Sequence, residues 1–420
     1  MSQAQSWETR SFVDLTDYRE VEEVLRRGRD FVVAGTKAES DEFVHGSLIA
    51  IDGREHLNRR RALMKMIRPS QPWGAEGGLV DAVYAHNLGR VRDAAEPADG
   101  MIRFDLIDFC KRVIWRVTAA FVGLDGVEDD ETVARFQRLG TDVVSGLTVE
   151  YAAPEERRRI LETAREARRQ IREEMYEPSI ARREALIREA GDDPDKRAAL
   201  PADLLTSLLL LPEDARLDDE LVFREMVAML SASVNNPVSQ AAWAVDDLLA
   251  WLADHPEDRA RIGEREFVNL AVKESLRLHR ASRPYLVRVA VEDTVLKSSG
   301  RFVPAGTWVS GWVEKANHDP SVFGADADAY NPHRTVEDPK APHFGVAFGA
   351  GPHVCLGRPM LLWEQGPEEF QGIQTKMVRF LLEGGVAKDP EGVQELVGVE
   401  GSFRYVRYDV VMPLPQNGTI

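Results

Sequence analysis

One of the two cysteines in this sequence lies in a glycine-rich loop, Phe348 to Gly357, directly before a segment with helical character. A free cysteine titrates near ~8.5, and its thiolate is the form that binds metals. Glycines allow sharp turns and close backbone approach, so N–H groups can point at the Cys355 sulfur and favour its ionised form. A thiolate is a soft iron ligand, and a haem with a thiolate axial ligand favours cleavage of the O–O bond. The competing interpretation is an ordinary buried cysteine.

The spacing Phe-x-x-Gly-x-x-x-Cys-x-Gly in this loop resembles the haem-ligand signature of the cytochrome P450 family, with matches at Phe348, Gly351, Cys355 and Gly357. The resemblance implies the mainly α haem-thiolate fold with minor β structure. It also implies haem b (iron protoporphyrin IX) as the cofactor and Cys355 as its iron ligand. Phe348, Gly349 and Gly357 are then expected to contact the haem.

Two further segments resemble other signatures of the family. Glu274 and Arg277 are three residues apart, so a helix would place them on one face, where they can pair. Arg334 follows Tyr330 in a segment that resembles the family's Phe-x-Pro-x-Arg motif. A network in which each buried charge has a bidentate partner makes physical sense of such a triad. Its expected role is to brace the loop behind the haem.

The two propionates of a haem need cations, and four residues match positions that supply them in the family. His56 and Arg60 are one helical turn apart and resemble the family's His-x-x-x-Arg helix. Arg288 matches the family's propionate arginine. His353 matches the histidine two residues before the cysteine. Taken singly, each could equally be an ordinary surface charge.

A basic cluster accompanies the His-x-x-x-Arg segment in a chain that is otherwise acidic. In the family, this helix borders the cysteine side of the haem, where an acidic electron donor such as a ferredoxin docks. A solvated helix face explains the same pattern, so both interpretations stay open. The cluster consists of Arg54, Arg59, Arg60, Arg61, Lys65 and Arg68.

The predicted central helix departs from the family's Ala-Gly-x-Asp/Glu-Thr-Thr pattern. We expect Ala232, Ser233, Asn235 and Asn236 to line the oxygen site, with Asn235 in place of the acid and Asn236 in place of the threonine. A carboxylate can release a proton near neutral pH, whereas an amide only forms hydrogen bonds. Pro237 lacks an N–H, so it would free the carbonyl of the residue four positions earlier.

Three functions remain open after this departure. The first is hydroxylation of a small lipophilic molecule, as in secondary metabolism, with O2, electrons from a redox partner, and protons from water or from the substrate. The second is a peroxide-driven or atypical oxidation, such as coupling or dehydration. The third is a haem-binding protein without catalytic activity. The full set of haem-binding candidates argues against the third.

Composition limits the partners and the location of the protein. The chain has 420 residues and a net charge of −17, which argues against nucleic-acid binding. No apolar run approaches a membrane span, and the N-terminus has no signal-peptide pattern. Cys110 lies far from Cys355 in an apolar context, typical of a buried residue. We therefore expect a cytoplasmic monomer, with residues 1–420 forming a single domain.

Helical periodicity dominates the elements that would position these residues. Helices are predicted for Asp17–Leu25, within 80–125, within the charge-rich 154–195, over Asp218–Leu252 with an interruption at Pro237, and over Glu264–Leu278. Strands are predicted for Leu286–Ala290 and Gly306–Val309 around a turn at Ser298–Gly300, and for Ser402–Val406 and Tyr408–Val411.

Overall fold

A computed structural model of the chain describes seven stretches and divides them into two compact units. Of the described residues, the first unit holds those in 32–68 and 114–234, and the second those in 12–31, 69–113 and 235–420. The described residues are 12–33, 40–64, 77–94, 100–280, 282–362, 372–399 and 402–414.

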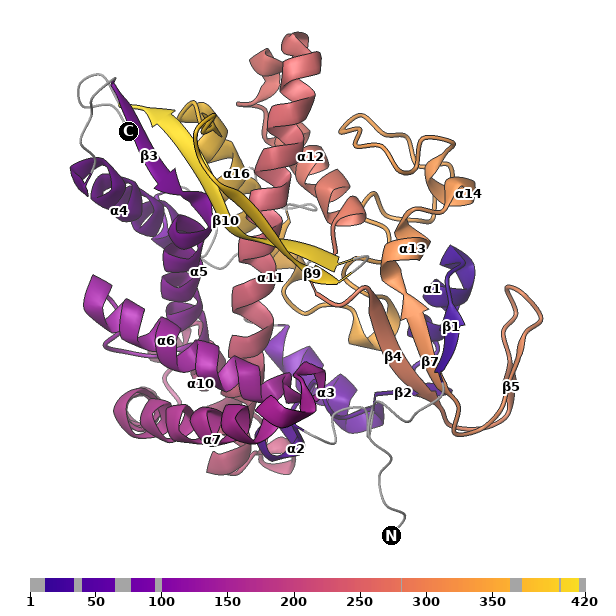
Figure 1. The fold of residues 1–420 in the computed structure, drawn as a ribbon. Coiled ribbons are helices and arrows are strands. Elements are labelled where there is room, and N and C mark those ends of the chain that lie inside the picture. The colour runs from indigo at the N-terminus through magenta and orange to yellow at the C-terminus, as the bar shows by residue number, and fades with distance from the viewer. Residues whose placement is uncertain are drawn as a thin grey trace. The chain divides into compact units, whose positions relative to one another are not determined.

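The described part of the first unit is mainly helical (Figure 1). Helix α6 begins after Asp129, whose carboxylate accepts the N–H groups of Glu131 and Thr132. It packs tightly on α7, because a Cβ at Gly146 would lie only 2.6 Å from the Cβ of Ala164. The helices are α2 (Asp41–Val44), α3 (Gly53–Leu63), α6 (Asp130–Leu147), η3 (Val149–Tyr151), α7 (Pro154–Ile171), the π-helical turn η4 (Arg172–Tyr176), α8 (Glu177–Ala190), α9 (Pro194–Ala198), α10 (Leu204–Leu209) and η5 (Glu213–Ala215).

The long central helix predicted from the sequence is α11, Asp219–Asp254, which runs from the first unit's residues into the second's. The predicted interruption at Pro237 is wrong, since the helix continues through this residue. The side-chain amide of Gln374, suitably oriented, bridges the Pro237 carbonyl (3.3 Å) and the Ala241 N–H (2.6 Å). These two groups are the pair that a regular helix joins directly, so Gln374 supports the helix just after its proline.

A four-stranded sheet in the second unit has the strand order β1-β7-β4-β2. Strand β1 (Phe12–Leu15) runs parallel to β7 (Trp308–Trp312), and β4 (Tyr285–Ala290) pairs antiparallel with β7. The predicted pairing across the Ser298–Gly300 turn is thus present, but the turn belongs to a smaller hairpin between them. That hairpin is β5 (Thr294–Val295) with β6 (Phe302–Val303), and the edge strand is β2 (Phe31–Val32).

A second sheet of this unit joins segments about 300 residues apart. Strand β3 (Met101–Asp105) pairs antiparallel with β10 (Ser402–Pro413), which forms a long hairpin with β9 (Gln394–Val399), yellow in Figure 1. The two strands predicted near the C-terminus are one, because β10 accommodates a register shift between Tyr405 and Arg407. The fourth strand of this sheet, β8 (Ala387–Lys388), also pairs antiparallel with β10.

The helices of the second unit include the predicted N-terminal helix and the helix of the Glu-x-x-Arg motif. They are α1 (Tyr18–Arg26), α4 (Leu79–Ala94), the start of α5 (Leu106–Val122), η6 (Pro256–Arg261), α12 (Arg265–Leu278), α13 (Val313–Asn317), α14 (Pro320–Phe323), η7 (Gly351–His353), α15 (Arg358–Leu361) and α16 (Ile373–Glu383). Within the described ranges, no helix combines the length and hydropathy that a membrane crossing requires. The single-domain prediction stays a prediction.

Candidate active site

The loop that carries Cys355 is a compact turn in the second unit. The Cys355 N–H donates to the carbonyl of Phe348 at 2.8 Å, which closes the loop on itself. Phe348 anchors the loop, because its ring is buried and meets Phe344 edge-on at 5.1 Å. Between the two bonded residues lies the short helix η7, and α15 follows the cysteine. The backbone therefore fixes the position of the Cys355 side chain.

Glycines let the N-terminal helix approach this loop closely. Gly351 has φ +67°, and a Cβ there would lie 2.5 Å from the carbonyl oxygen of Leu25, at the end of α1. From the other side, a Cβ at Gly28 would lie 2.8 Å from Cγ of Pro352. Side chains at Gly351 or Gly28 would separate the loop from α1, so the shape of the cysteine loop depends on both glycines.

The two cysteines lie in opposite environments. Cys355 is exposed, and a Cβ at Gly357 would lie 3.8 Å from its Sγ, an ordinary van der Waals distance. Cys110 is fully buried, and burial raises the pKa of its thiol. A low pKa and access are what a thiolate ligand needs. The exposed Cys355 thiol is therefore accessible to ligate the iron of a haem.

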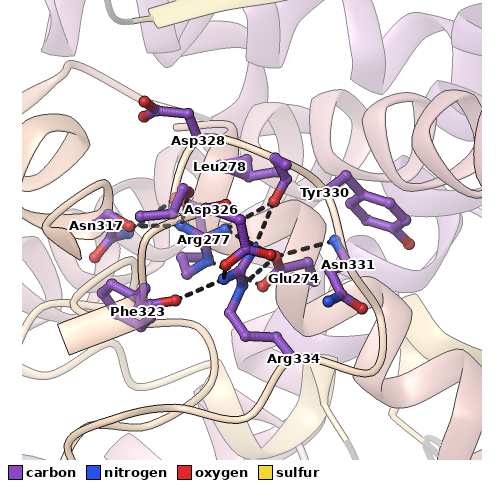
Figure 2. A network of polar contacts seen from close by, with 12 residues as sticks. Glu274, Arg277, Leu278, Asn317, Phe323, Asp326, Asp328, Tyr330, Asn331 and Arg334 are labelled. Carbon is purple, nitrogen blue, oxygen red and sulfur yellow. Dashed lines mark hydrogen bonds and ion pairs between the residues drawn. The ribbon is translucent and has the colours of Figure 1, made fainter. Parts of the chain in front are cut away.

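The predicted Glu274–Arg277–Arg334 triad is present in the second unit (Figure 2). Arg277 forms a bidentate pair with Glu274, with distances of 2.7 and 2.9 Å. Arg334 donates from Nε to the same carboxylate at 2.8 Å, and from Nη1 to Asp326 at 2.7 Å. All three members of the motif are at most 5% exposed.

Backbone carbonyls use the remaining donors of this network. Arg277 donates to the carbonyls of Asn317 and Ala327, and Arg334 donates to that of Phe323. The two guanidiniums thereby tie α12 to the irregular segment before the cysteine loop, as Figure 2 shows. A buried charge network with satisfied donors holds such a segment rigidly.

Two of the four propionate candidates lie in the second unit. Arg288 is on β4, 7% exposed, and its Nη1 donates to the carbonyl of Val287 at 2.7 Å. His353 ends η7, two residues before the cysteine, and is partly buried. Both side chains carry N–H groups that can donate hydrogen bonds to a carboxylate.

The other two candidates lie in the first unit, on α3. His56 is buried and Arg60 is partly buried, one helical turn apart as the sequence predicts. Between them, Arg59 is 5% exposed and donates to Glu225 at 2.6 Å and to the carbonyl of Gly46 at 2.5 Å. Arg59 is thus a structural residue.

This geometry corrects the predicted docking cluster. Its inclusion of Arg59 is wrong, because the Glu225 carboxylate neutralises that guanidinium inside the unit. Arg54 and Arg61 are exposed on α3, and Arg60 is partly buried. Lys65 and Arg68 lie outside the described residues.

The four predicted oxygen-site residues lie at the middle of α11. Ala232 and Asn235 are exposed, and Ser233 and Asn236 are partly buried, although Val234 between them is fully buried. The Ser233 hydroxyl donates to the carbonyl of Met229 at 2.8 Å, a bond within the helix. The exposed positions recur at helical spacing, so α11 presents a polar face at its centre.

The sequence analysis missed Arg280, which lies next to the cysteine loop in the second unit. Its guanidinium donates to the carbonyl of Arg283 at 2.9 Å and to that of Ala347. Burial lowers the pKa of Arg280 to about 10, and the negative charge of Cys355 acts in the opposite direction. The available signal was its place three residues after Arg277, just beyond the end of α12.

Comparison with known proteins identifies the family. The sequence model of "Cytochrome P450" matches residues 6–364. The chain therefore belongs to the cytochrome P450 family of monooxygenase-type oxidoreductases, whose cofactor is a haem iron and which act on small molecules with a redox partner. The family resemblance inferred from the cysteine loop is confirmed, as is the mainly α fold class with minor β structure.

Curated relatives include three bacterial monooxygenases. Luteothin monooxygenase of Streptomyces thioluteus is 35% identical over 165 residues, which are 39% of this chain and 38% of that protein. Cyclooctat-9-en-7-ol 5-monooxygenase of Streptomyces melanosporofaciens is 26% identical, over 82% of this chain and 75% of the relative. Mycinamicin IV hydroxylase/epoxidase of Micromonospora griseorubida is 27% identical, over 82% and 77%. Several first-ranked relatives are matched over less than half their length.

Solved structures share the fold. CYP109E1 of Bacillus megaterium in complex with corticosterone gives a TM-score of 0.70 at 20% identity, covering 98% of this chain and 95% of that one. P450BioI in complex with an acyl carrier protein gives a TM-score of 0.69 at 17% identity, covering 97% and 94%. At these identities the likeness concerns the fold alone.

Proposed function

We propose that this protein is a haem-thiolate monooxygenase that hydroxylates a small lipophilic molecule with O2 and electrons from a ferredoxin-like donor. The observation that carries the proposal is the exposed Cys355 thiol in a loop closed by its own N–H bond to Phe348. Relatives named for monooxygenation of luteothin and of a cyclooctatenol support a role in secondary metabolism.

The residues of this chain would divide the work as follows. Cys355 binds the iron of haem b, and Phe348, Gly349 and Gly357 shape the loop beneath it. Arg288 and His353, and on α3 His56 and Arg60, offer donors for the two propionates. When bound, the haem supplies an iron that activates dioxygen.

The polar face of α11 would line the oxygen-binding site. The exposed Asn235 and partly buried Asn236 can orient a water, but neither can take up or release a proton near neutral pH. The Ser233 hydroxyl and the exposed surface at Ala232 complete this face. Protons would therefore come through ordered water or from polar groups of the substrate.

A second candidate function follows from the same two amides. If no relay delivers protons to oxygen, the protein would use peroxide or perform an oxidation such as coupling or dehydration. A haem-binding protein without activity is the third possibility. Product formation with a ferredoxin and its reductase, with peroxide alone, or with neither separates the three.

The remaining elements of the proposal concern partners and location. An acidic donor would meet the exposed Arg54 and Arg61 of α3, and its electron transfer should weaken as ionic strength rises. We further propose that the protein works as a cytoplasmic monomer with one domain over residues 1–420. A chain with two cysteines far apart in sequence gives no sign of a disulfide framework, which suits a reducing compartment.

The carbon monoxide spectrum of the reduced protein tests the core of this proposal. Thiolate ligation by Cys355 should give the strongly red-shifted Soret band of the family, and Cys355→Ala should abolish both band and activity. A band at the shorter wavelength of histidine-ligated haem, in folded wild-type protein, would refute it. Spectral shifts on adding a panel of lipophilic compounds would then narrow the substrate class.

A further inference from the structure

Arg280 and Cys355 bind neighbouring carbonyls of one loop. The guanidinium of Arg280 donates to the carbonyl of Ala347, and the N–H of Cys355 donates to that of Phe348, the next residue. Both contacts lie within the second unit. The Arg280 guanidinium therefore contacts the segment that holds Cys355 in place. Arg280 is not one of the motif residues described above.

Arg280 differs in its partners from three buried arginines, Arg59, Arg277 and Arg334. Arg277 and Arg334 pair with Glu274, and Arg59 pairs with Glu225. In the described part of the chain, Arg280 pairs with no carboxylate; its hydrogen bonds go to two carbonyls. A partly buried charge that lacks an opposite charge is costly. An anion near the cysteine loop would offset that cost.

The backbone around Arg280 is held from several sides, so the charge has a defined place. The side-chain amide of Gln240 donates to the carbonyl of His279, and Ser402 Oγ donates to that of Arg280 at 3.5 Å. The His279 ring stacks on Trp243 with 3.8 Å between centroids and 5° between planes. It is also 3.1 Å from Asp247. These contacts hold His279, the residue directly before Arg280, in a defined position.

We propose that Arg280 is a positioning residue whose fixed positive charge acts on the Cys355 thiolate and weakens the sulfur's electron donation to the haem iron. This inference rests on the proposed haem-thiolate function. Charges and hydrogen bonds around a ligating sulfur tune the reduction potential of the metal. An arginine suits this task because it stays protonated over the working pH range. The expected consequence is a higher reduction potential of the iron.

The test compares three variants of the haem-loaded protein with the wild type. Arg280→Gln removes the charge, Arg280→Lys keeps it, and Arg283→Gln is the matched control, because the backbone carbonyl of Arg283 is retained. The midpoint potential of the ferric/ferrous couple is measured by spectroelectrochemistry, and the Fe–S stretch by resonance Raman spectroscopy. We expect Arg280→Gln to lower the potential and raise the Fe–S frequency, with Arg280→Lys and Arg283→Gln close to the wild type.

Each contrary outcome overturns the inference in a distinguishable way. An unchanged potential in Arg280→Gln, or an equal fall in Arg283→Gln, refutes a specific effect of this charge. A lower potential with an unchanged Fe–S stretch would mean that the Arg280 charge acts on another anion, such as a propionate, and not on the thiolate. Loss of haem in Arg280→Lys, which keeps the charge, shows that the bond to Ala347 matters instead. A wild type without the red-shifted carbon monoxide band refutes the proposed function as well.

Discussion

Arg334 donates from Nε to the Glu274 carboxylate at 2.8 Å across 60 residues of sequence, and both side chains are only 3% exposed. Removing the anion leaves the buried Arg277 with backbone carbonyls only and leaves Arg334 with Asp326 as its one carboxylate partner among the described residues. We expect Glu274→Gln to lower the free energy of unfolding by about 3–5 kcal/mol, the range for a broken buried pair. Urea unfolding followed by circular dichroism measures the loss.

A matched control for this variant is Glu162→Gln on α7. Glu162 lies 3.8 Å from Arg158, and both side chains are largely exposed. Exposed pairs contribute little to stability, so this variant should unfold at the same urea concentration as the wild type. Equal stability of both variants would contradict the bracing role of Glu274.

A pH-dependent contribution to stability is expected from Glu23 on α1. Burial raises the pKa of its carboxyl, but the N–H groups of Lys297 and Ser298, each at 2.8 Å, and Arg27 outweigh it. The net result is a pKa lowered to about 2. Since the unfolded carboxyl titrates near ~4.3, the folded state binds fewer protons between these values.

The sign follows from proton linkage: this contribution is present above the unfolded pKa and is lost as the pH falls towards 2. Glu23→Gln should therefore differ most from the wild type in unfolding free energy at pH 6. The difference should shrink between about pH 4.5 and 2. Glu22→Gln is the control, because Glu22 pairs with Arg26 in the same helix and accepts no backbone N–H from the loop. A constant difference for Glu23→Gln across this range would contradict the prediction.

The two cysteines should differ in reactivity. In protein prepared without haem, iodoacetamide should modify the exposed Cys355 and leave the buried Cys110 unmodified, because burial hinders access and raises the pKa of that thiol. Peptide mass spectrometry gives the extent at each site. In about 8 M urea, which unfolds the protein, both cysteines should react. Equal labelling in the folded protein would contradict the described burial of Cys110.

Placing a carboxylate and a hydroxyl at the two amide positions of α11 should improve proton delivery. We expect Asn235→Asp with Asn236→Thr to raise the fraction of consumed electrons that appears in product, because a carboxylate and a hydroxyl can pass protons that amides cannot. The ratio of product formed to reduced donor consumed measures this coupling. Ser239→Thr, at a buried position of the same helix, is the control. Unchanged coupling in the double variant would favour water, substrate groups or peroxide.

Local patterns in the sequence sufficed for the helices and for motif residues. Asp17 caps α1, and Glu274 and Arg277 meet because three residues span nearly one helical turn. Arg334 was reached through the family motif alone, since no local rule links it to Glu274. The cysteine loop could be predicted because its glycines stand where the backbone turns sharply or approaches another segment closely, as at Gly351.

Long-range pairings were beyond that reasoning. Strand β3 is only five residues long and exists because it pairs with β10, about 300 residues later. Arg59 looked like a surface charge because its partner, Glu225, is 166 residues away. Arg280 was missed for the same reason, since its contact with Ala347 spans 67 residues.

The close approach of Gly28 and Gly351 has a consequence for biosynthesis. Helix α1 leaves the ribosome before the loop it packs against, which lies more than 320 residues later in the sequence. The contact between α1 and the cysteine loop can therefore form only after that loop has been synthesised, and non-local contacts of this kind form slowly. Until then, the end of α1 lacks its partner surface. Haem is accordingly expected to bind only after the cysteine loop has been synthesised and has packed on α1.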